Sequence, residues 1–490
     1  MATDSDVNTS GGFAFTQEKS QIGLDRERKE RRTRRMLAAG LGVALAAVGT
    51  GTGLYLTSPA PKAPKAPQPP CLSCVSDGSH VFPGDDQAMR AVLAAIAKEN
   101  AAVRARKGRP YVSIMVLNPM TPGVGSDLTP TRMVDELRGA YLAQVTMDAT
   151  GTLGIQLLLD DEGTSAEANV VPAVRQLMTM EGAPDHVVAL AGDGVSNAQT
   201  ATGASMLVRN GMPIFGGLTA ADEFNGNTFN GMIQVEPDVA EEVAQLASWL
   251  PTPRTAVLVY DQQATDYYTS DLRTNFTQDY AKSLTDEAQP YMPGVSDTNV
   301  EFEAIADEVC YTSGRPPVVL YAGRDAVLAA LVQQFQDDGN CHGKKITMLT
   351  GGDGDGLAPA VTASAPGTGQ VSVIYTGMVN LNNLTSAFQQ SYQQTLGKLD
   401  PGDTGLGDEW MAGTYNAMMA AWAAIQPAYE ASAPAIPTRS DVLGFVVRLN
   451  GMFTPSGAAG SFPLSADGEI TSPDIPIFED KAGQRITLSS

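Results

Sequence analysis

From residue 111 onward, short runs of Val, Ile and Leu alternate with stretches of helical periodicity. Examples of the apolar runs are YVSIMVLN, LGIQLLLDD, HVVALAG, TAVLVYD and VSVIYTG. Strands that alternate with helices of about 10–15 residues are typical of βαβ units around a parallel sheet. Because these strands are apolar throughout, we expect helices to cover both faces of the sheet. The pattern therefore predicts an α/β fold.

The alternation occurs twice along the chain. Residues 186–206 (HVVALAGDGVSNAQTATGASM) and 345–364 (KITMLTGGDGDGLAPAVTAS) share a strand, a Gly-Asp-Gly loop and the start of a helix. This similarity predicts two doubly wound lobes that are built alike. In open α/β sheets, ligands bind beyond the carboxyl ends of the strands. The loops that follow the strands are therefore where we expect a binding site.

An apolar run at residues 36–56 follows the basic segment RERKERRTRR. Its length of about 20 residues is what a helix needs to cross a membrane, and positive charge is retained on the cytoplasmic side. We expect a cytoplasmic tail at 1–35, a transmembrane signal anchor at 36–56, a Pro-rich linker at 57–77 and a helical extension at 78–109. The chain beyond the span is then extracellular.

Three alternatives to an anchor remain open. A cleaved signal peptide has a shorter apolar core, of about 7–15 residues, and Pro61 hinders cleavage at the small residues that precede it. A lipoprotein has its Cys directly after the apolar core, whereas Cys71 lies behind the Pro-rich stretch. A buried globular helix rarely carries such a basic flank.

Composition limits the partners and the compartment. The formal net charge of −22 argues against nucleic acid or an anionic membrane as a binding surface. Cys310 and Cys341 bracket one strand–helix unit, which predicts a disulfide and an oxidising compartment. Cys71 and Cys74 form CLSC at the end of the linker; a local or intermolecular disulfide is one interpretation, and redox or metal chemistry is the other.

Polar side chains at the strand ends suggest how a solute is held. Ser196, Asn197 and Thr219 offer hydroxyl and amide groups on the first lobe. On the second, Asp353 can hold an ammonium group, with Tyr321 and Tyr267 nearby. The alternative is that these residues belong to ordinary βα loops with helix caps.

Catalytic motifs are missing from the sequence. The chain has three histidines, His80, His186 and His342, and none falls in a catalytic pattern. G-x-S-x-G, P-loop and H-E-x-x-H motifs are also absent. We expect neither an enzyme nor a cofactor or metal site.

In order and spacing, the strand-end loops resemble type I periplasmic binding proteins, particularly the branched-chain amino acid (Leu/Ile/Val) group. The resemblance covers about residues 110–478 and rests on YVSIMVLNPMTPG, LAGDGVSNAQTA, NGMPIFGGLTA, VLVYDQQATDYY, TMLTGGDGDGL and GAAGSFPLSADGEI. It implies two lobes joined by three crossovers, one of residues 110–236 with 379–455 and the other of 237–378 with 456–490. The ligand-binding residues that it implies are Ser196, Asn197, Leu218, Thr219, Ala220, Thr265, Tyr267, Tyr321 and Asp353.

Three features depart from the family. Asp193 lies in a loop that is serine-rich in the family, Arg324 adds a cation, and the membrane anchor is unusual for a transport component. We expect a tethered receptor for a small polar ligand, an amino acid or related amide, working with an ABC permease or a membrane signalling partner. The alternatives are an envelope hydrolase that uses Asp193, Asp325 and Asp353, and a scaffold that has lost ligand binding.

Overall fold

The computed structural model describes residues 75–80, 82, 87–121, 128–164, 170–251, 255–263, 265–285, 288–294, 298–311, 316–399, 409–451, 453–471 and 473–489. All of them belong to one compact unit, residues 67–490. The expected tail at 1–35, the span at 36–56, most of the linker, Cys71 and Cys74 lie outside these ranges and stay predictions. Within the ranges, no helix combines the length and the apolar character needed to cross a membrane.

The first lobe is built on a parallel sheet in the order β2-β1-β3-β4-β5. Its strands are β1 (Tyr111–Asn118), β2 (Gly154–Asp161), β3 (Val187–Asp193), β4 (Ile214–Gly216) and β5 (Met232–Gln234). All residues of β2 to β5 and all but Tyr111 of β1 are buried, which confirms that the sheet is covered on both faces.

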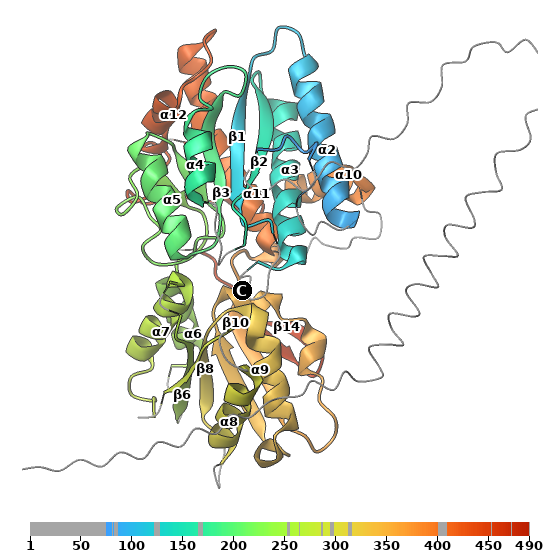
Figure 1. Cartoon of the computed structure of the whole chain (residues 1–490), viewed down its shortest axis with the longest axis vertical. Helices are drawn as coiled ribbons and strands as arrows, with labels where there is room; N and C mark the ends of the chain where they lie inside the picture. Colours follow the sequence, from blue (N-terminus) through green and yellow to red (C-terminus); the bar gives the residue numbers. More distant parts are fainter. Residues whose placement is uncertain are drawn as a thin grey trace, which may run out of the picture. The chain divides into compact units, whose positions relative to one another are not determined.

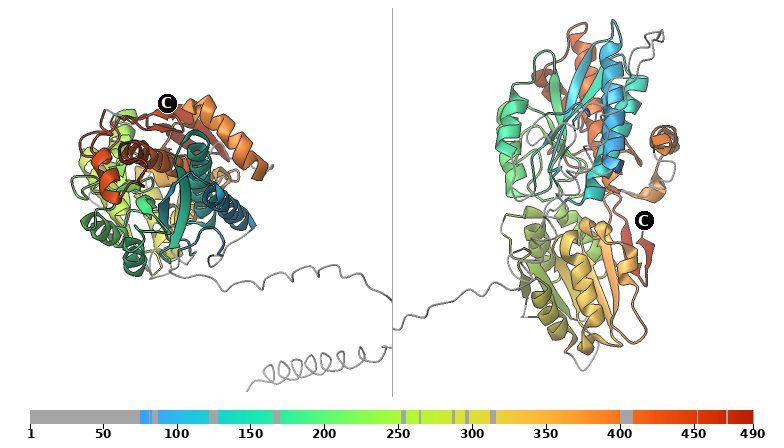
Figure 2. Two further views of the ribbon diagram at one scale, coloured as in Figure 1. Left: turned by 90° about the horizontal axis from the view of Figure 1, so that it is seen from above. Right: turned by 45° about the vertical axis from the view of Figure 1, so that its right-hand side comes forward.

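Helices cover this sheet in two groups (Figure 1). One hydrophobic cluster joins the sheet to α2 (Gln87–Ala105), α3 (Pro130–Thr150), α10 (Ser386–Leu399), α11 (Glu409–Ser432) and α12 (Arg439–Val446). A second cluster joins the other face to α4 (Val170–Met178) and α5 (Ala198–Arg209). Figure 2 shows α10 beside the rest of the first group, on the outside of the lobe.

The second lobe has a sheet in the order β14-β13-β10-β9-β8-β6-β7. Strands β6 (Ala256–Asp261), β7 (Gln289–Tyr291), β8 (Val318–Ala322), β9 (Lys345–Thr350) and β10 (Gln370–Thr376) are parallel. The C-terminal hairpin of β13 (Ile477–Lys481) and β14 (Gln484–Ser489) adds to the β10 edge in antiparallel fashion.

The helices of the second lobe also form two groups. One group is α6 (Val239–Trp249) and α7 (Tyr267–Asp279), and the other is α8 (Thr298–Cys310) and α9 (Asp325–Asp337). Short 3₁₀ turns lie at η1 (Gly339–Cys341), η2 (Gly352–Gly356), η3 (Pro359–Thr362) and η4 (Leu381–Asn383). The disulfide Cys310–Cys341 joins the end of α8 to η1, as the spacing of the cysteines predicts.

The described chain passes between the lobes three times: after β5, after β10 and before β13. We expected residues 456–490 to belong to the second lobe as a whole, but the structure divides them. Ala458 and Leu464 join the core of the first lobe, next to a small hairpin of β11 (Ser456–Gly457) and β12 (Gly460–Ser461). The amide of Ala458 donates to Asn416 Oδ1 of α11 at 2.8 Å, which fixes this segment to the first lobe.

Candidate functional site

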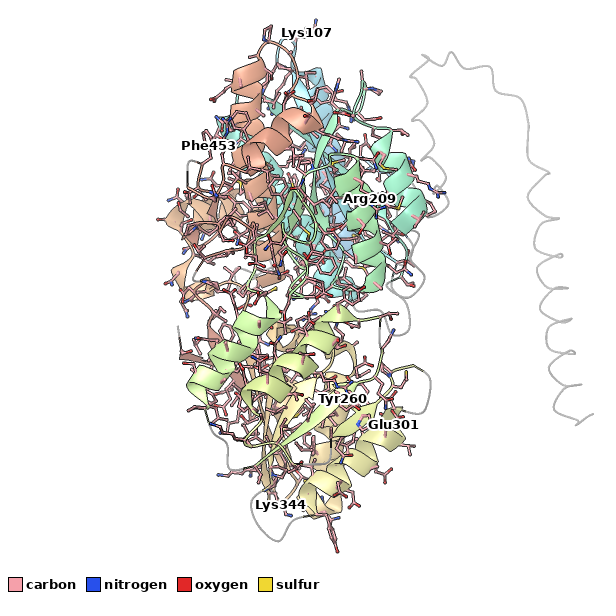
Figure 3. All side chains as sticks on the ribbon, turned by 90° about the vertical axis from the view of Figure 1, so that its left-hand side faces the viewer. Lys107, Arg209, Tyr260, Glu301, Lys344 and Phe453 are labelled. Atoms are coloured by element: carbon pink, nitrogen blue, oxygen red, sulfur yellow. A yellow bond between two sulfur atoms is a disulfide. The ribbon has the colours of Figure 1, made fainter. Side chains whose placement is uncertain are left out.

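Strand-end loops of the two lobes meet directly, close to where Figure 1 shows α5 above α7. The amide of Ala198 donates to the carbonyl of Thr265 at 2.9 Å, and the amide of Tyr267 donates to the carbonyl of Ser196 at 3.1 Å. In Figure 3 the labelled residues Lys107 and Lys344 lie at the far ends of the first and the second lobe, away from this junction. The loops that the sequence singles out are therefore brought together.

Arg324 forms hydrogen bonds to three residues at the junction, that is, where the strand-end loops of the two lobes meet. Its guanidinium donates to both oxygens of Asp266, at 2.8 and 3.0 Å, and to Asp353 Oδ2 at 3.2 Å. It also reaches across to the carbonyl of Ser196 at 3.4 Å and lies over the ring of Tyr268 at 4.5 Å. The Arg324 side chain therefore ties the first lobe to two carboxylates of the second.

Arg132 makes the matching contact from the first lobe. It lies in the first turn of α3, which starts from the N-cap Thr129 and Pro130. Its Nη1 is 3.3 Å from Asp325 Oδ2 and 3.3 Å from Asp353 Oδ1, and its Nη2 donates to the Asp353 carbonyl at 3.1 Å. The guanidinium stacks 3.9 Å from the ring centroid of Trp410. Arg132 is not among the ligand-binding residues that the sequence resemblance implies.

Asp353 lies at the centre of these contacts, in η2. Its two carboxylate oxygens face two different arginines, and its amide donates to the hydroxyl of Tyr268 at 3.1 Å. Glycines on its N-terminal side allow the close packing: a Cβ at Gly351 would lie 2.3 Å from Glu242 Oε2. That oxygen accepts the Gly352 amide at 3.0 Å, and burial raises the pKa of Glu242 to about 8.

Ser196 and Asn197 both take part in local contacts. The hydroxyl oxygen of Ser196 accepts the amide of Ala221 at 3.0 Å. Asn197 is the N-cap of α5, and its Oδ1 accepts the amides of Gln199 and Thr200 at 2.8 and 3.0 Å. The alternative interpretation of Asn197 as a helix cap therefore describes its side chain in this structure.

The three residues that follow β4 have different surroundings. Leu218 belongs to the core of the first lobe, while Ala220 packs with the second lobe and its carbonyl accepts the Val239 amide at 2.9 Å. Thr219 is fully buried, and its hydroxyl has no hydrogen-bond partner among the described residues. Among these three residues, Thr219 is therefore the one whose side-chain hydroxyl is available to a ligand.

Tyr321 does not cover the junction as we expected. It is fully buried within β8, and its hydroxyl lies 2.9 Å from that of Tyr291 and donates to the carbonyl of Arg324 at 2.8 Å. Its position inside the second lobe supports the loop that carries Arg324. Tyr267 does reach the first lobe, where its ring lies 6.3 Å from that of Phe224.

Other cavities lie elsewhere on the described chain. One of about 590 Å³ is lined by Asp77, Arg104, Tyr111 and Gln156, among others. A smaller one of about 200 Å³ lies beside the second crossing, where Met378, Asn380 and Phe462 line it. In the described ranges, no group of three His, Cys, Asp or Glu side chains has an arrangement that could hold a metal ion.

Comparison with known proteins depends on structure alone, since no protein-family profile and no curated protein sequence matches the chain. One similar solved structure is the isoleucine complex of LivJ, a branched-chain amino acid transporter substrate-binding protein of Streptococcus pneumoniae. It is 12% identical, with a TM-score of 0.57 over 78% of this chain and 100% of the other. A leucine complex of an ABC transporter substrate-binding protein from Desulfitobacterium hafniense is 14% identical, with a TM-score of 0.57 over 77% and 100%.

A third similar structure is a possible leucine/isoleucine/valine-binding protein from Rhodopirellula baltica, 13% identical with a TM-score of 0.57. It is matched over 79% of this chain and 98% of its own. Each of the three is matched over at least 98% of its own length. Identities this low establish the architecture and leave the ligand open. The chain has the type I periplasmic binding protein fold.

Proposed function

We propose that this chain is an extracytoplasmic receptor that holds a small polar solute between its two lobes. The observation that carries the proposal is the meeting of strand-end loops from both sheets, at Ser196–Tyr267 and Ala198–Thr265. In open α/β sheets this edge is where ligands bind. The solved structures that share the fold are described as substrate-binding proteins, which supports the same role here.

Opening and closing would take place at the three crossings. The lobes are held together here by Arg132 on Asp353 and by Arg324 on the Ser196 carbonyl. A solute enters only when these contacts part, and they can form again once it is bound. Hinge closure of this kind places the moving residues in a few connecting segments.

We also propose that residues 36–56 anchor the receptor in the cell membrane, with residues 1–35 inside and the lobes outside. The Cys310–Cys341 disulfide supports an oxidising compartment for the lobes. A fixed receptor delivers its solute to a neighbouring ABC permease or reports occupancy to a membrane signalling partner. The test is membrane fractionation of cells that express the full chain: alkaline carbonate should not release the protein, and its release would contradict the anchor.

A hydrolase with Asp325 and Asp353 as its acid and base has less support. Both carboxylates are in ion pairs with Arg132, and Asp353 also pairs with Arg324. The side chains that face these two carboxylates are therefore the chain's own arginines. We therefore propose a binding role without catalysis.

The test is a thermal-denaturation screen of the purified full chain in detergent against amino acids, amides, amines and sugars. A bound solute should raise the melting temperature in a saturable way. Thr219→Val removes only the unpartnered hydroxyl and should weaken that effect, while Thr202→Val, on the exposed face of α5, should not. If no solute of any class stabilises the protein, the receptor proposal is wrong and a ligand-free scaffold is the better description.

A further inference from the structure

The carboxyl edge of the first sheet carries a row of buried polar side chains. In the order of the strands across the sheet, β2-β1-β3-β4-β5, a polar residue lies at or just beyond the end of every strand. These residues are Glu162, Asn118, Asp193, Thr219 and Glu236, and all are buried. Because the strands are parallel, their carboxyl ends share one edge, so the five side chains follow one another along it.

Three oxygen atoms of this row have no hydrogen-bond donor among the described residues. They are Oδ2 of Asp193, Oγ1 of Thr219 and Oε1 of Glu236, on side chains that are 2%, 0% and 2% exposed. Asp193 ends β3, and Thr219 and Glu236 follow β4 and β5. These three strands are adjacent, and neighbouring strands lie about 4.8 Å apart, so the strands themselves span about 10 Å. A buried acceptor has lost its hydration, and a donor from another molecule would replace it.

The charges in this row have one sign. The pKa of Glu162 is raised, first by burial and then by the nearby carboxylate of Asp193. Burial also raises the pKa of Asp193, to about 7, and that of Glu236, to which Glu242 and Asp353 add. Burial is the largest cause of all three pKa shifts, and for Glu236 the charge of Arg324 acts in the opposite direction.

The arginines at the junction form their ion pairs with other carboxylates. Arg132 pairs with Asp325 and Asp353, and Arg324 pairs with Asp266 and Asp353, all in the second lobe. Across the described parts of the chain, no ion pair forms to Glu162, Asp193 or Glu236. Asp266, Asp325 and Asp353 of the second lobe are therefore paired with arginines of the chain itself. The three carboxyl groups of the first-lobe row have no ion pair among the described residues.

A carboxylate on the solute has few donors available here. Amides at the start of a helix are the usual partners of such an anion. At α5, the Ala198 amide donates to Thr265, and those of Gln199 and Thr200 donate to Asn197. An anion next to Asp193 would also meet a like charge.

We propose that the solute is a small organic cation, an amine or a guanidine without an adjacent carboxylate, whose N–H groups donate to Asp193, Thr219 and Glu236. This inference rests on the proposed receptor function and specifies its ligand class. It differs from the amino acid that the sequence resemblance implies. Charge-assisted hydrogen bonds to carboxylates are short and strong, which suits a site that must close on its ligand.

The test compares pairs of compounds that differ in one carboxylate. Calorimetric titration of the full chain in detergent would use agmatine against arginine and putrescine against ornithine, with leucine as the neutral-side-chain amino acid. The amine of at least one pair should bind tenfold or more tightly than its amino acid. If arginine, ornithine or leucine binds and the amines do not, the charge inference is wrong while the receptor function stands. If no compound of any class binds, both are wrong.

Variants of the row test its role directly. Glu236→Gln keeps the volume and removes the charge, and it should weaken binding of the amine at least tenfold. Asp193→Asn should do the same and serves as the second test if Glu236→Gln does not fold. Glu303→Gln, on the exposed face of α8, is the matched control and should leave the affinity unchanged. Folded Glu236→Gln and Asp193→Asn proteins that bind the amine as the parent does would overturn the proposal.

Discussion

At the scale of single residues, Asp353 forms contacts between the lobes that its strand-end motif does not predict. From the Gly-Asp-Gly loop, this carboxylate is expected to face a ligand ammonium group. In the structure its two oxygens face Arg132 and Arg324, one from each lobe. Asp353 pairs with cations, as predicted, but these cations are side chains of the chain itself. Arg132 and Arg324 are distant from each other in the sequence, so no local sequence pattern indicates that both contact Asp353.

Asp353→Asn should therefore destabilise the folded protein. The change leaves two buried guanidinium groups with one carboxylate partner fewer each, and breaking a buried ion pair costs about 3 kcal/mol. Urea denaturation would measure the loss in the free energy of unfolding. Asp337→Asn, on the exposed part of α9, is the control and should change it by less than about 0.5 kcal/mol. Equal stabilities of the two variants would contradict the role assigned to Asp353.

Among elements, strands were more predictable than helix ends. The apolar run at Tyr111–Asn118 predicts β1 with its observed bounds. α3 begins at Pro130, before the apolar periodicity starts, so only its Thr-Pro cap signalled the first turn that holds Arg132. α10 was not predicted. Its sequence is rich in Gln and Ser, so the three buried apolar residues at helical spacing, Phe388, Tyr392 and Leu396, give only a weak periodic signal.

The start of α5 gives a prediction about Asn197. As the N-cap, its side chain accepts two amides, so Asn197→Ala should lower the free energy of unfolding by about 1 kcal/mol. Asn197→Asp retains an accepting oxygen and should lose much less. Chemical denaturation of both variants checks this. If alanine and aspartate cost the same, the cap is not what stabilises this end of the helix.

The disulfide gives a prediction for the outer part of the second lobe. Cys310 and Cys341 are separated by 31 residues, and closing a loop of that length in the unfolded chain is worth about 4 kcal/mol. The double variant Cys310→Ala/Cys341→Ala should therefore unfold at a lower temperature than the parent. A reducing agent should lower the melting temperature of the parent more than that of the variant. If the variant and the parent have the same melting temperature, the disulfide does not stabilise the folded protein in this way.

For the whole molecule, buried carboxyl groups set the response to pH. The pKa is raised to about 7 for Asp193 and Asp160 and to about 8 for Glu242. Unfolded carboxyl groups have pKa values of about 4, so between pH 5 and 8 the folded chain keeps protons that the unfolded chain has lost. The free energy of unfolding should therefore fall as the pH rises through this window. The melting temperature should be lower at pH 8 than at pH 5, and the opposite slope would contradict the burial of these groups.

Hydrogen–deuterium exchange of the full chain, with and without the tightest-binding solute, tests most directly whether the solute lies between the lobes. A solute between the lobes should slow amide exchange in both lobes together: in loops 193–197 and 217–221 of the first, and in loop 350–356 of the second. Peptides near Lys107 and Lys344, at the far ends, should exchange unchanged. Protection confined to one lobe, or to the cavity beside Asn380 and Phe462, would contradict binding between the strand ends.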